Sequence, residues 1–184
     1  NRGFYYFDPE FLLVDADSTI GNNKVNLYVN TKPETPVEAR KIYKINKVFI
    51  YSNYSLNDAV ADTNPSHARF YSGYYVVDSS KFYNPRLFAQ AMQFDPGETY
   101  NRRQHNITLN RLINLGIFKF VKNRFEPVGD TALNAYYYLT PLPKKSLRGE
   151  IGGVTKSNNL TGSQVSFGFT NKNTFKGGEI LTVD

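Results

Sequence analysis

Two side chains in this sequence have the type best suited to acid–base chemistry near neutral pH: His67 and His105, its only histidines. Neither belongs to a His-x-x-x-His pair or to a visible Ser-His-Asp arrangement. His105 falls in a predicted helix and is expected to be a helix-face residue, whereas His67 falls in a predicted loop. The carboxylates are scattered, with no defensible general acid/base pair. We therefore expect no enzyme activity and no catalytic residue.

Three aspartates, Asp8, Asp15 and Asp17, lie close enough along the chain to suggest a cation site. Their spacing lacks the glycine and the terminal glutamate of a calcium loop, and neighbouring carboxylates in turns are usually solvated. There are no cysteines, which excludes disulfides and thiolate metal sites. The glycine pairs at 152–153 and 177–178 lie in β-type sequence rather than before a helix. We expect neither a metal nor a cofactor.

Composition limits the choice of partners. The chain has 184 residues, a net charge of +6 and a pI of about 9.4, which suits an anionic partner such as nucleic acid or lipid headgroups. A solvated basic surface explains the same charge. The sequence contains no run of about 18 apolar residues, so it predicts no membrane-spanning helix. The first residue, Asn1, follows no signal-like segment, and the chain ends within a patterned run, so we expect a fragment of a longer protein.

The chain is organised around residues 84–142. Asn84 and Pro85 are a typical helix start, and a second helix is predicted at 101–115, ending at Gly116. The second helix carries an apolar stripe of Leu109, Leu112, Ile113 and Leu115. Two β-rich runs follow, at 117–125 and 133–139, and the second has clear alternation: Leu133, Ala135, Tyr137 and Leu139. The sequence therefore predicts helices followed by a hairpin.

A further strand is expected upstream, at 42–51, from its β-branched and aromatic content. We expect Ile42, Lys44, Asn46 and Val48 on one face of it, and Tyr43, Ile45, Lys47 and Phe49 on the other. The polar insertion at 55–80 is predicted to be a long loop with one short extended piece. Residues 41–142 thus have the order β, α, α, β, β, which predicts an α+β domain with a three-stranded sheet and both helices on one face.

Residues 1–32 resemble the trailing hairpin of a second such unit. A glycine, an aromatic run, a polar turn and the alternating Val25, Leu27 and Val29 repeat the order seen after Gly116. We expect residues 4–14 and 24–30 to pair as an antiparallel hairpin. A proline-punctuated linker at 33–41 separates it from the next unit.

Residues 84–142 resemble a POTRA (polypeptide-transport-associated) domain in two segments: 96–100 between the helices, and 109–118, which turns helix into strand. Residues 146–184 resemble the first strands of an outer-membrane β-barrel in the segments 147–153 and 169–179. Together they are similar to the BamA/TamA-like assembly and translocation proteins of the surface antigen D15 superfamily. The resemblance implies a POTRA hairpin at 1–32, a POTRA domain at 41–143 with an insertion at 55–80, and the start of a barrel at 146–184.

The barrel interpretation has a physical basis. Val165, Phe167 and Phe169 alternate with polar or small residues, as in membrane strands with one lipid-facing side. A soluble hairpin of a β-sandwich is the alternative. Because an isolated hairpin is marginal in water, we expect this segment either to pair edge to edge with another copy or to fold back against its own sheet.

The resemblance implies a location at the bacterial outer membrane, on the periplasmic side. The expected partners are unfolded outer-membrane protein clients, neighbouring POTRA units and accessory assembly proteins, and the membrane itself. An open strand edge can bind an extended client by β-augmentation. We predict this edge at Ile117, Lys119, Val121, Asn123 and Phe125. The predicted membrane-surface cations are Lys119, Lys122, Arg124, Lys144 and Lys145. An edge that is purely structural, with no client, remains an alternative.

Two other classes of binding protein are compatible with parts of the sequence. A cell-surface glycan binder or adhesin could stack sugars on Tyr71, Tyr74 and Tyr75. A nucleic-acid binder needs aromatic and basic side chains on one face, but Tyr136 and Tyr138 have no lysine or arginine beside them in the sequence. We therefore expect no nucleic-acid partner.

Overall fold

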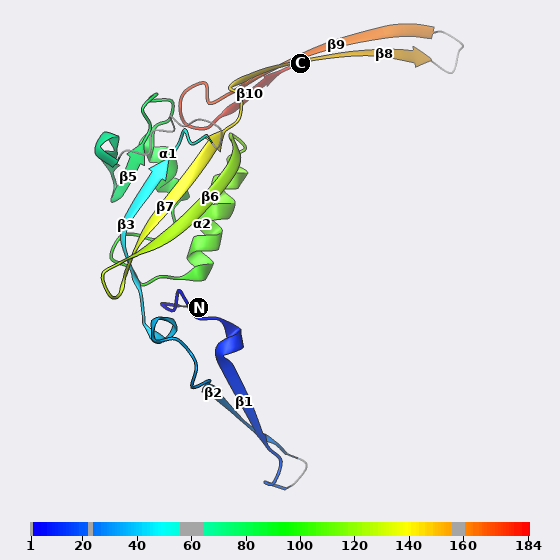
Figure 1. The fold of residues 1–184 in the computed structure, drawn as a ribbon. Coiled ribbons are helices and arrows are strands. Elements are labelled where there is room, and N and C mark those ends of the chain that lie inside the picture. Colours follow the sequence, from blue (N-terminus) through cyan, green and yellow to red (C-terminus); the bar gives the residue numbers. More distant parts are fainter. Residues whose placement is uncertain (1, 22–23, 56–64, 156–160) are drawn as a thin grey trace.

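The computed structural model describes residues 2–21, 24–55, 65–155 and 161–184. These residues form a central α+β domain with two strand assemblies extending from it in different directions (Figure 1). The blue hairpin near the N-terminus lies beyond one end of the domain, and the orange and red strands near the C-terminus lie beyond the other. The described residues therefore form three sheets, and the helices pack on the central one.

The central sheet has five strands in the order β4–β5–β3–β7–β6. They are β3 (Lys44–Tyr51), β4 (Arg69–Tyr71), β5 (Tyr74–Val77), β6 (Phe118–Val128) and β7 (Ala132–Pro141). Strand β3 is parallel to both β5 and β7, whereas β6 and β7 form an antiparallel hairpin. The three predicted strands are present, but the prediction of a three-stranded sheet is wrong in number because the insertion adds β4 and β5.

The insertion contributes a hairpin rather than a loop with one extended piece. Strands β4 and β5 meet at Ser72 and Gly73, which both have positive φ, 49° and 91°. Two successive left-handed residues are the requirement of a tight hairpin turn that matches strand twist. A 3-10 turn, η3 (Pro65–His67), precedes β4. Residues 56–64 of the predicted loop lie outside the described residues.

Both predicted helices are confirmed, as α1 (Pro85–Ala91) and α2 (Arg102–Asn114). The Asn84 side chain accepts a hydrogen bond from the Arg86 amide at 3.0 Å, and Asn101 caps Arg103 in the same way. These caps satisfy amides that have no partner inside the helix. Gly116 follows α2 with φ of 68°, as a helix-ending glycine does. No helix among the described residues combines the length and apolar character needed to cross a membrane.

The core lies between the two helices and one face of the sheet. The alternation predicted for β7 is confirmed, because Leu133, Ala135, Tyr137 and Leu139 are all fully buried. From the helices, Phe88 and Leu112 are equally buried and belong to the same cluster. Removal of this apolar surface from water is the main stabilising contribution to the domain.

The predicted faces of β3 are wrong beyond Ile45. Ile45, Val48 and Ile50 all point into the core, because the register with β7 shifts between Ile45 and Val48. An extra residue in one strand reverses which side chains face inward from that point on. This bulge explains why apolar and polar residues do not alternate regularly along β3.

The outer face of the sheet carries a second, aromatic cluster built on Phe49, Tyr51 and Val77. Phe49 stacks between Tyr75 and Tyr136, with ring centroids 5.1 and 5.2 Å away, and Tyr51 stacks on Tyr138 at 5.1 Å. Offset stacking of this kind adds to the stabilisation from burial. These tyrosines therefore stack with aromatic side chains of neighbouring strands and stabilise the outer face of the sheet.

The N-terminal hairpin is shorter than predicted. Strands β1 (Leu12–Asp17) and β2 (Asn26–Thr31) pair antiparallel and form a sheet of their own, apart from the central sheet. Residues 4–8 are not part of a strand, and a 3-10 turn, η1 (Pro9–Phe11), leads into β1. Tyr5 instead packs edge-on against Tyr100, with ring centroids 5.1 Å apart. A second 3-10 turn, η2 (Val37–Arg40), lies in the predicted linker.

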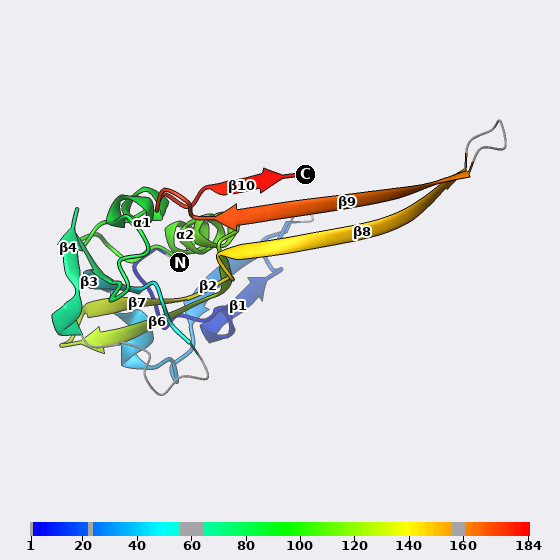
Figure 2. The same ribbon diagram turned by 90° about the horizontal axis from the view of Figure 1, so that it is seen from above.

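The C-terminal sheet has the order β10–β9–β8, formed by β8 (Lys145–Thr155), β9 (Thr161–Lys172) and β10 (Ile180–Val183). Seen from above, β8 and β9 extend far beyond the central domain, while β10 runs beside the base of β9 (Figure 2). The segment is therefore a three-stranded antiparallel sheet anchored at one end.

Candidate client-binding edge and membrane-facing strands

Strand β6 is a long open edge of the central sheet. It has 11 residues and pairs with β7 on one side, and among the described residues no strand pairs with its other side. Its outward N–H and C=O groups are therefore available to an added strand. The opposite edge, β4, has only three residues.

The five residues predicted for this edge do not share one exposed face. Ile117 precedes β6 and is 2% exposed, and Phe125 is buried against Tyr5 and Tyr100. Val121 and Asn123 are half-buried, and Lys119 is exposed at a register irregularity between Phe118 and Phe120. The buried side chains of Ile117 and Phe125 hold the edge in place, so an added strand there meets their backbone only.

The predicted cations are all exposed, but they lie in two places. Lys119, Lys122 and Arg124 lie on β6, and Arg124 Nε is 3.0 Å from Glu126 Oε1. An exposed pair of this kind contributes little to stability. Lys144 and Lys145 lie where the chain leaves β7 for β8. In cross-strand register, Lys122 and Arg124 lie opposite Tyr138 and Tyr136, a proximity that local sequence does not show.

The sheet of β8 and β9 has one apolar face and one polar face. Leu147 pairs with Phe169 and Ile151 with Val165, and residues paired across strands point to the same side. Leu147 and Ile151 are each 85% exposed, and Phe167 is 75% exposed. On the other side, Arg148 forms an ion pair with Glu150. The predicted alternation is confirmed. Strands β8 and β9 do not fold back against the central sheet, whereas β10 of the same segment turns back and pairs with β9.

A turn at residues 173–179, here called the junction turn, attaches the C-terminal sheet to the central domain. The Asn84 amide donates to the Lys176 carbonyl at 2.8 Å, and Gly178 packs against Leu87 and Ile117. Asn173 is buried with φ of 61°; its Nδ2 donates to the Phe82 carbonyl at 2.8 Å and its Oδ1 accepts from the Gly178 amide at 3.0 Å. Asn173 was not among the predicted site residues, although asparagine is one of the few residue types that tolerate a left-handed backbone.

We expect Asn173→Ala to loosen this junction. The change leaves the partly buried Phe82 carbonyl and Gly178 amide without their partner, which costs about 1 kcal/mol, the low end of the range for unsatisfied groups. Faster hydrogen exchange at the Gly178 amide and faster proteolysis within 173–179 should report it. Asn171→Ala is the matched control, because Asn171 Oδ1 has no hydrogen-bond partner in the described structure. Equal exchange rates in the two variants would contradict the assignment.

His105 lies within α2, as predicted, but its ring points into the core rather than outward. The ring is 8% exposed, its Nδ1 lies 3.0 Å from the Tyr137 hydroxyl, and it packs edge-on against Phe125. Burial, assisted by the nearby Arg102, lowers the pKa of His105 to about 4. The neutral ring is therefore a structural element of the core.

The tyrosines proposed for glycan binding do not lie together on one surface. Tyr74 is buried and its hydroxyl donates to the Phe94 carbonyl and to Asp95, whereas Tyr75 stacks on Phe49 across the sheet. With Tyr71 these side chains do not make one sugar-stacking platform. Asp17 accepts hydrogen bonds from Thr19, which lowers its pKa. The described residues contain no cluster of three potential metal ligands.

Comparison with solved structures places this architecture among known folds. BamA from Haemophilus ducreyi lacking POTRA domains 1–3 matches 93% of the chain with a TM-score of 0.52 and 12% identity. The chain has the fold of a BamA/Omp85-like POTRA region. It spans 26% of the length of that BamA chain. No protein-family model and no curated protein matches the sequence.

Two further structures are similar over smaller parts. POTRA domains 1–3 of Omp85 from Anabaena match 72% of this chain and 42% of their own, at 14% identity and a TM-score of 0.40. POTRA domains 3–5 of BamA from Haemophilus influenzae match 76% of this chain and 74% of their own, at 16% identity and a TM-score of 0.30. The match to BamA from Haemophilus ducreyi, with its TM-score of 0.52, confirms the predicted fold class, a mixed α+β POTRA architecture.

Proposed function

We propose that this chain is the periplasmic POTRA region of an outer-membrane protein, continued by the first strands of its β-barrel. It binds unfolded outer-membrane or secreted polypeptides on β6 and delivers them to the barrel for insertion or translocation. One observation carries the proposal: an 11-residue open strand edge lies in the same chain as an exposed amphipathic sheet. The localisation that follows is the outer membrane of a Gram-negative bacterium.

The β6 edge suits a client of variable sequence. An extended peptide that adds beside β6 gains main-chain hydrogen bonds whatever its side chains are. Lys119, Lys122 and Arg124 on the same strand oppose uncontrolled pairing between copies, as edge charges do. The core side chains behind β6 keep the edge straight while a client binds and leaves.

Strands β8 and β9 suit a membrane. They have 11 and 12 residues, and a tilted strand needs about 9–11 residues to cross the hydrocarbon layer. Their exposed apolar side is the lipid-facing side of such a strand, and the side with Arg148 and Glu150 is the interior side. Edge-to-edge pairing with another copy is the alternative way to complete this sheet in an isolated fragment.

The N-terminal hairpin suits a neighbouring POTRA unit. Val14, Leu27 and Val29 lie on one face of it and are each more than half exposed. An apolar face of this kind needs a covering partner, and we assign that role to the preceding unit or to an accessory assembly protein.

Cross-linking tests the client edge, because the chain contains no cysteine to interfere. Lys122→Cys on β6 should form a disulfide with a cysteine-bearing peptide of alternating apolar and polar residues taken from an outer-membrane strand. Phe70→Cys, exposed on the β4 edge, is the matched control and should react several-fold less. Equal yields at the two edges, or equal yields with a scrambled peptide that cannot form a strand, would overturn client binding at β6.

A further inference from the structure

A small pocket lies at the point where the POTRA domain meets the C-terminal sheet. Four segments line it: Phe82 and Tyr83 before α1, Ile117 before β6, the residues Pro141, Leu142 and Lys144 at and after the end of β7, and Lys172 and Asn173 at the end of β9. Its volume is about 140 Å³, and one water molecule requires roughly 10–15 Å³. The pocket can therefore hold a group of several heavy atoms.

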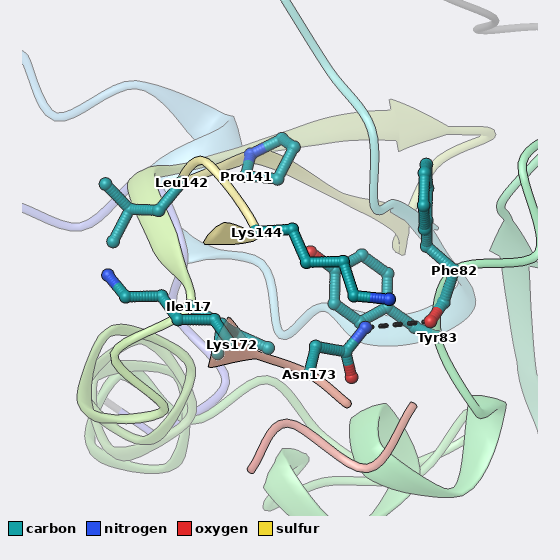
Figure 3. Close-up of a pocket in the computed structure, with 8 residues that line it drawn as sticks. All are labelled: Phe82, Tyr83, Ile117, Pro141, Leu142, Lys144, Lys172 and Asn173. Carbon is teal, nitrogen blue, oxygen red and sulfur yellow. Dashed lines mark hydrogen bonds between the residues drawn. The ribbon is translucent and has the colours of Figure 1, made fainter. Parts of the chain in front are cut away.

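The pocket is built before any ligand arrives, because backbone hydrogen bonds join its walls. The Leu142 amide donates to the Ile117 carbonyl at 2.9 Å, and the Lys172 amide donates to the Lys144 carbonyl at 2.7 Å. Asn173 holds the third wall through the Phe82 carbonyl, the dashed contact in Figure 3. Ile117 and Tyr83, which form its floor, are 2% and 6% exposed.

Two lysines flank this apolar floor. Figure 3 shows the side chains of Lys144 and Lys172 along the rim, with their ammonium groups on different sides of the pocket. Within the described residues, neither ammonium group has a hydrogen bond or an ion pair with a protein group. Each sits on a flexible four-carbon stem and can turn toward an anion above the pocket.

The lysines stand at a fixed distance from the apolar face of the C-terminal sheet. Lys144 precedes Leu147 by three residues, and Lys172 follows Phe169 by three residues. Three residues of a strand span roughly 10 Å. Cations placed about this far from the first lipid-facing side chains lie at the level of the headgroups. Lys81, Lys145 and Lys176 lie near the same junction in the chain and are exposed.

We propose that this pocket binds the headgroup of an anionic phospholipid. Lys144 and Lys172 contact the phosphate, and the floor of Tyr83 and Ile117, with Leu142 beside it, receives the glycerol and the first carbons of an acyl chain. The bound lipid would seal the junction between the POTRA domain and the membrane strands. The inference rests on the proposed function, because it requires β8 and β9 to lie in a membrane.

A monomeric lipid tests the pocket directly. Dihexanoyl phosphatidylglycerol, kept below its micelle concentration, is titrated into the full chain while amide NMR signals are followed. We expect saturable shifts at Leu142, Lys172 and Asn173, with dihexanoyl phosphatidylcholine binding more weakly. Lys144→Gln with Lys172→Gln should weaken binding by roughly tenfold or more. Lys145→Gln with Lys176→Gln removes the same charge outside the pocket and should change it less than about twofold.

Four results would overturn the proposal: no saturable shifts at the pocket, equal losses in the two double variants, equal binding of the two lipids, or equal binding of inorganic phosphate. The last would make the pocket a phosphate site without lipid. Flotation with neutral phosphatidylcholine vesicles reports the membrane strands separately, because it depends on the apolar face. If the chain binds vesicles but shows no NMR shifts with the monomeric lipid, only the lipid site is contradicted. If it shows neither vesicle binding nor NMR shifts, the proposed function is contradicted as well.

Discussion

Phe88→Ala should lower the free energy of unfolding by about 3–5 kcal/mol, the usual range for removing a buried phenylalanine. Phe88 is fully buried on α1, with its ring 5.8 Å from Tyr83 and 6.3 Å from Phe118. Its removal leaves a cavity between the helix and the sheet that close-packed neighbours cannot fill. Urea unfolding followed by circular dichroism measures the change.

Phe120→Ala is the matched control for this prediction. Phe120 is 51% exposed on β6, so the same chemical change removes far less buried surface. We expect a loss below about 1 kcal/mol there, as at most surface positions. Similar losses in the two variants would show that α1 does not pack on the sheet as described.

Acidification should destabilise the domain through His105. Burial lowers the pKa of His105 to about 4 in the folded chain, against 6.5 when the ring is exposed. The unfolded chain therefore takes up a proton in this pH range and the folded chain does not. The stability due to neutral His105 is complete above pH 6.5 and declines as the pH falls toward 4, by up to about 1.4 kcal/mol per pH unit.

His105→Phe isolates this effect. The phenyl ring retains the contact with Phe125 but cannot titrate, at the expense of the hydrogen bond with the Tyr137 hydroxyl. Between pH 7 and pH 4.5 we expect the unmodified chain to lose on the order of 2 kcal/mol more than the variant. Parallel loss of stability in both would mean that His105 is charged or solvated in the folded chain. Fits of urea unfolding at each pH provide the comparison.

Local patterns predicted the elements whose signals lie within a few residues. Asn84 and Asn101 identified the helix starts because capping involves only the next two or three amides. Gly116 marked the end of α2 for a similar local reason. The alternation of β7 predicted its buried face correctly, because that strand runs against β6 with only one irregularity, at its far end.

Predictions failed where distant segments decided the outcome. The bulge in β3 appears only in its pairing with β7, about ninety positions later in the chain, and it reverses the faces of Val48 and Ile50. The insertion joined the sheet because β5 lies parallel to β3. The aromatic residues before Pro9 were predicted to begin a strand. They pack on the central domain instead, because the Tyr5 ring contacts the rings of Tyr100 and Phe125.

The sequence by itself determined the secondary-structure elements of this protein: two capped helices, a hairpin after them, and strands with one apolar side. These depend on backbone preference and on periodicity, which neighbouring residues set. Tertiary structure decided which strand is the open edge, which edge residues are buried, and how Asn173 joins the C-terminal sheet to the loop before α1. It also created the pocket between Lys144 and Lys172, because residues from four separate segments line it. No local pattern encodes such a meeting, since the energy that forms it comes from packing among all four.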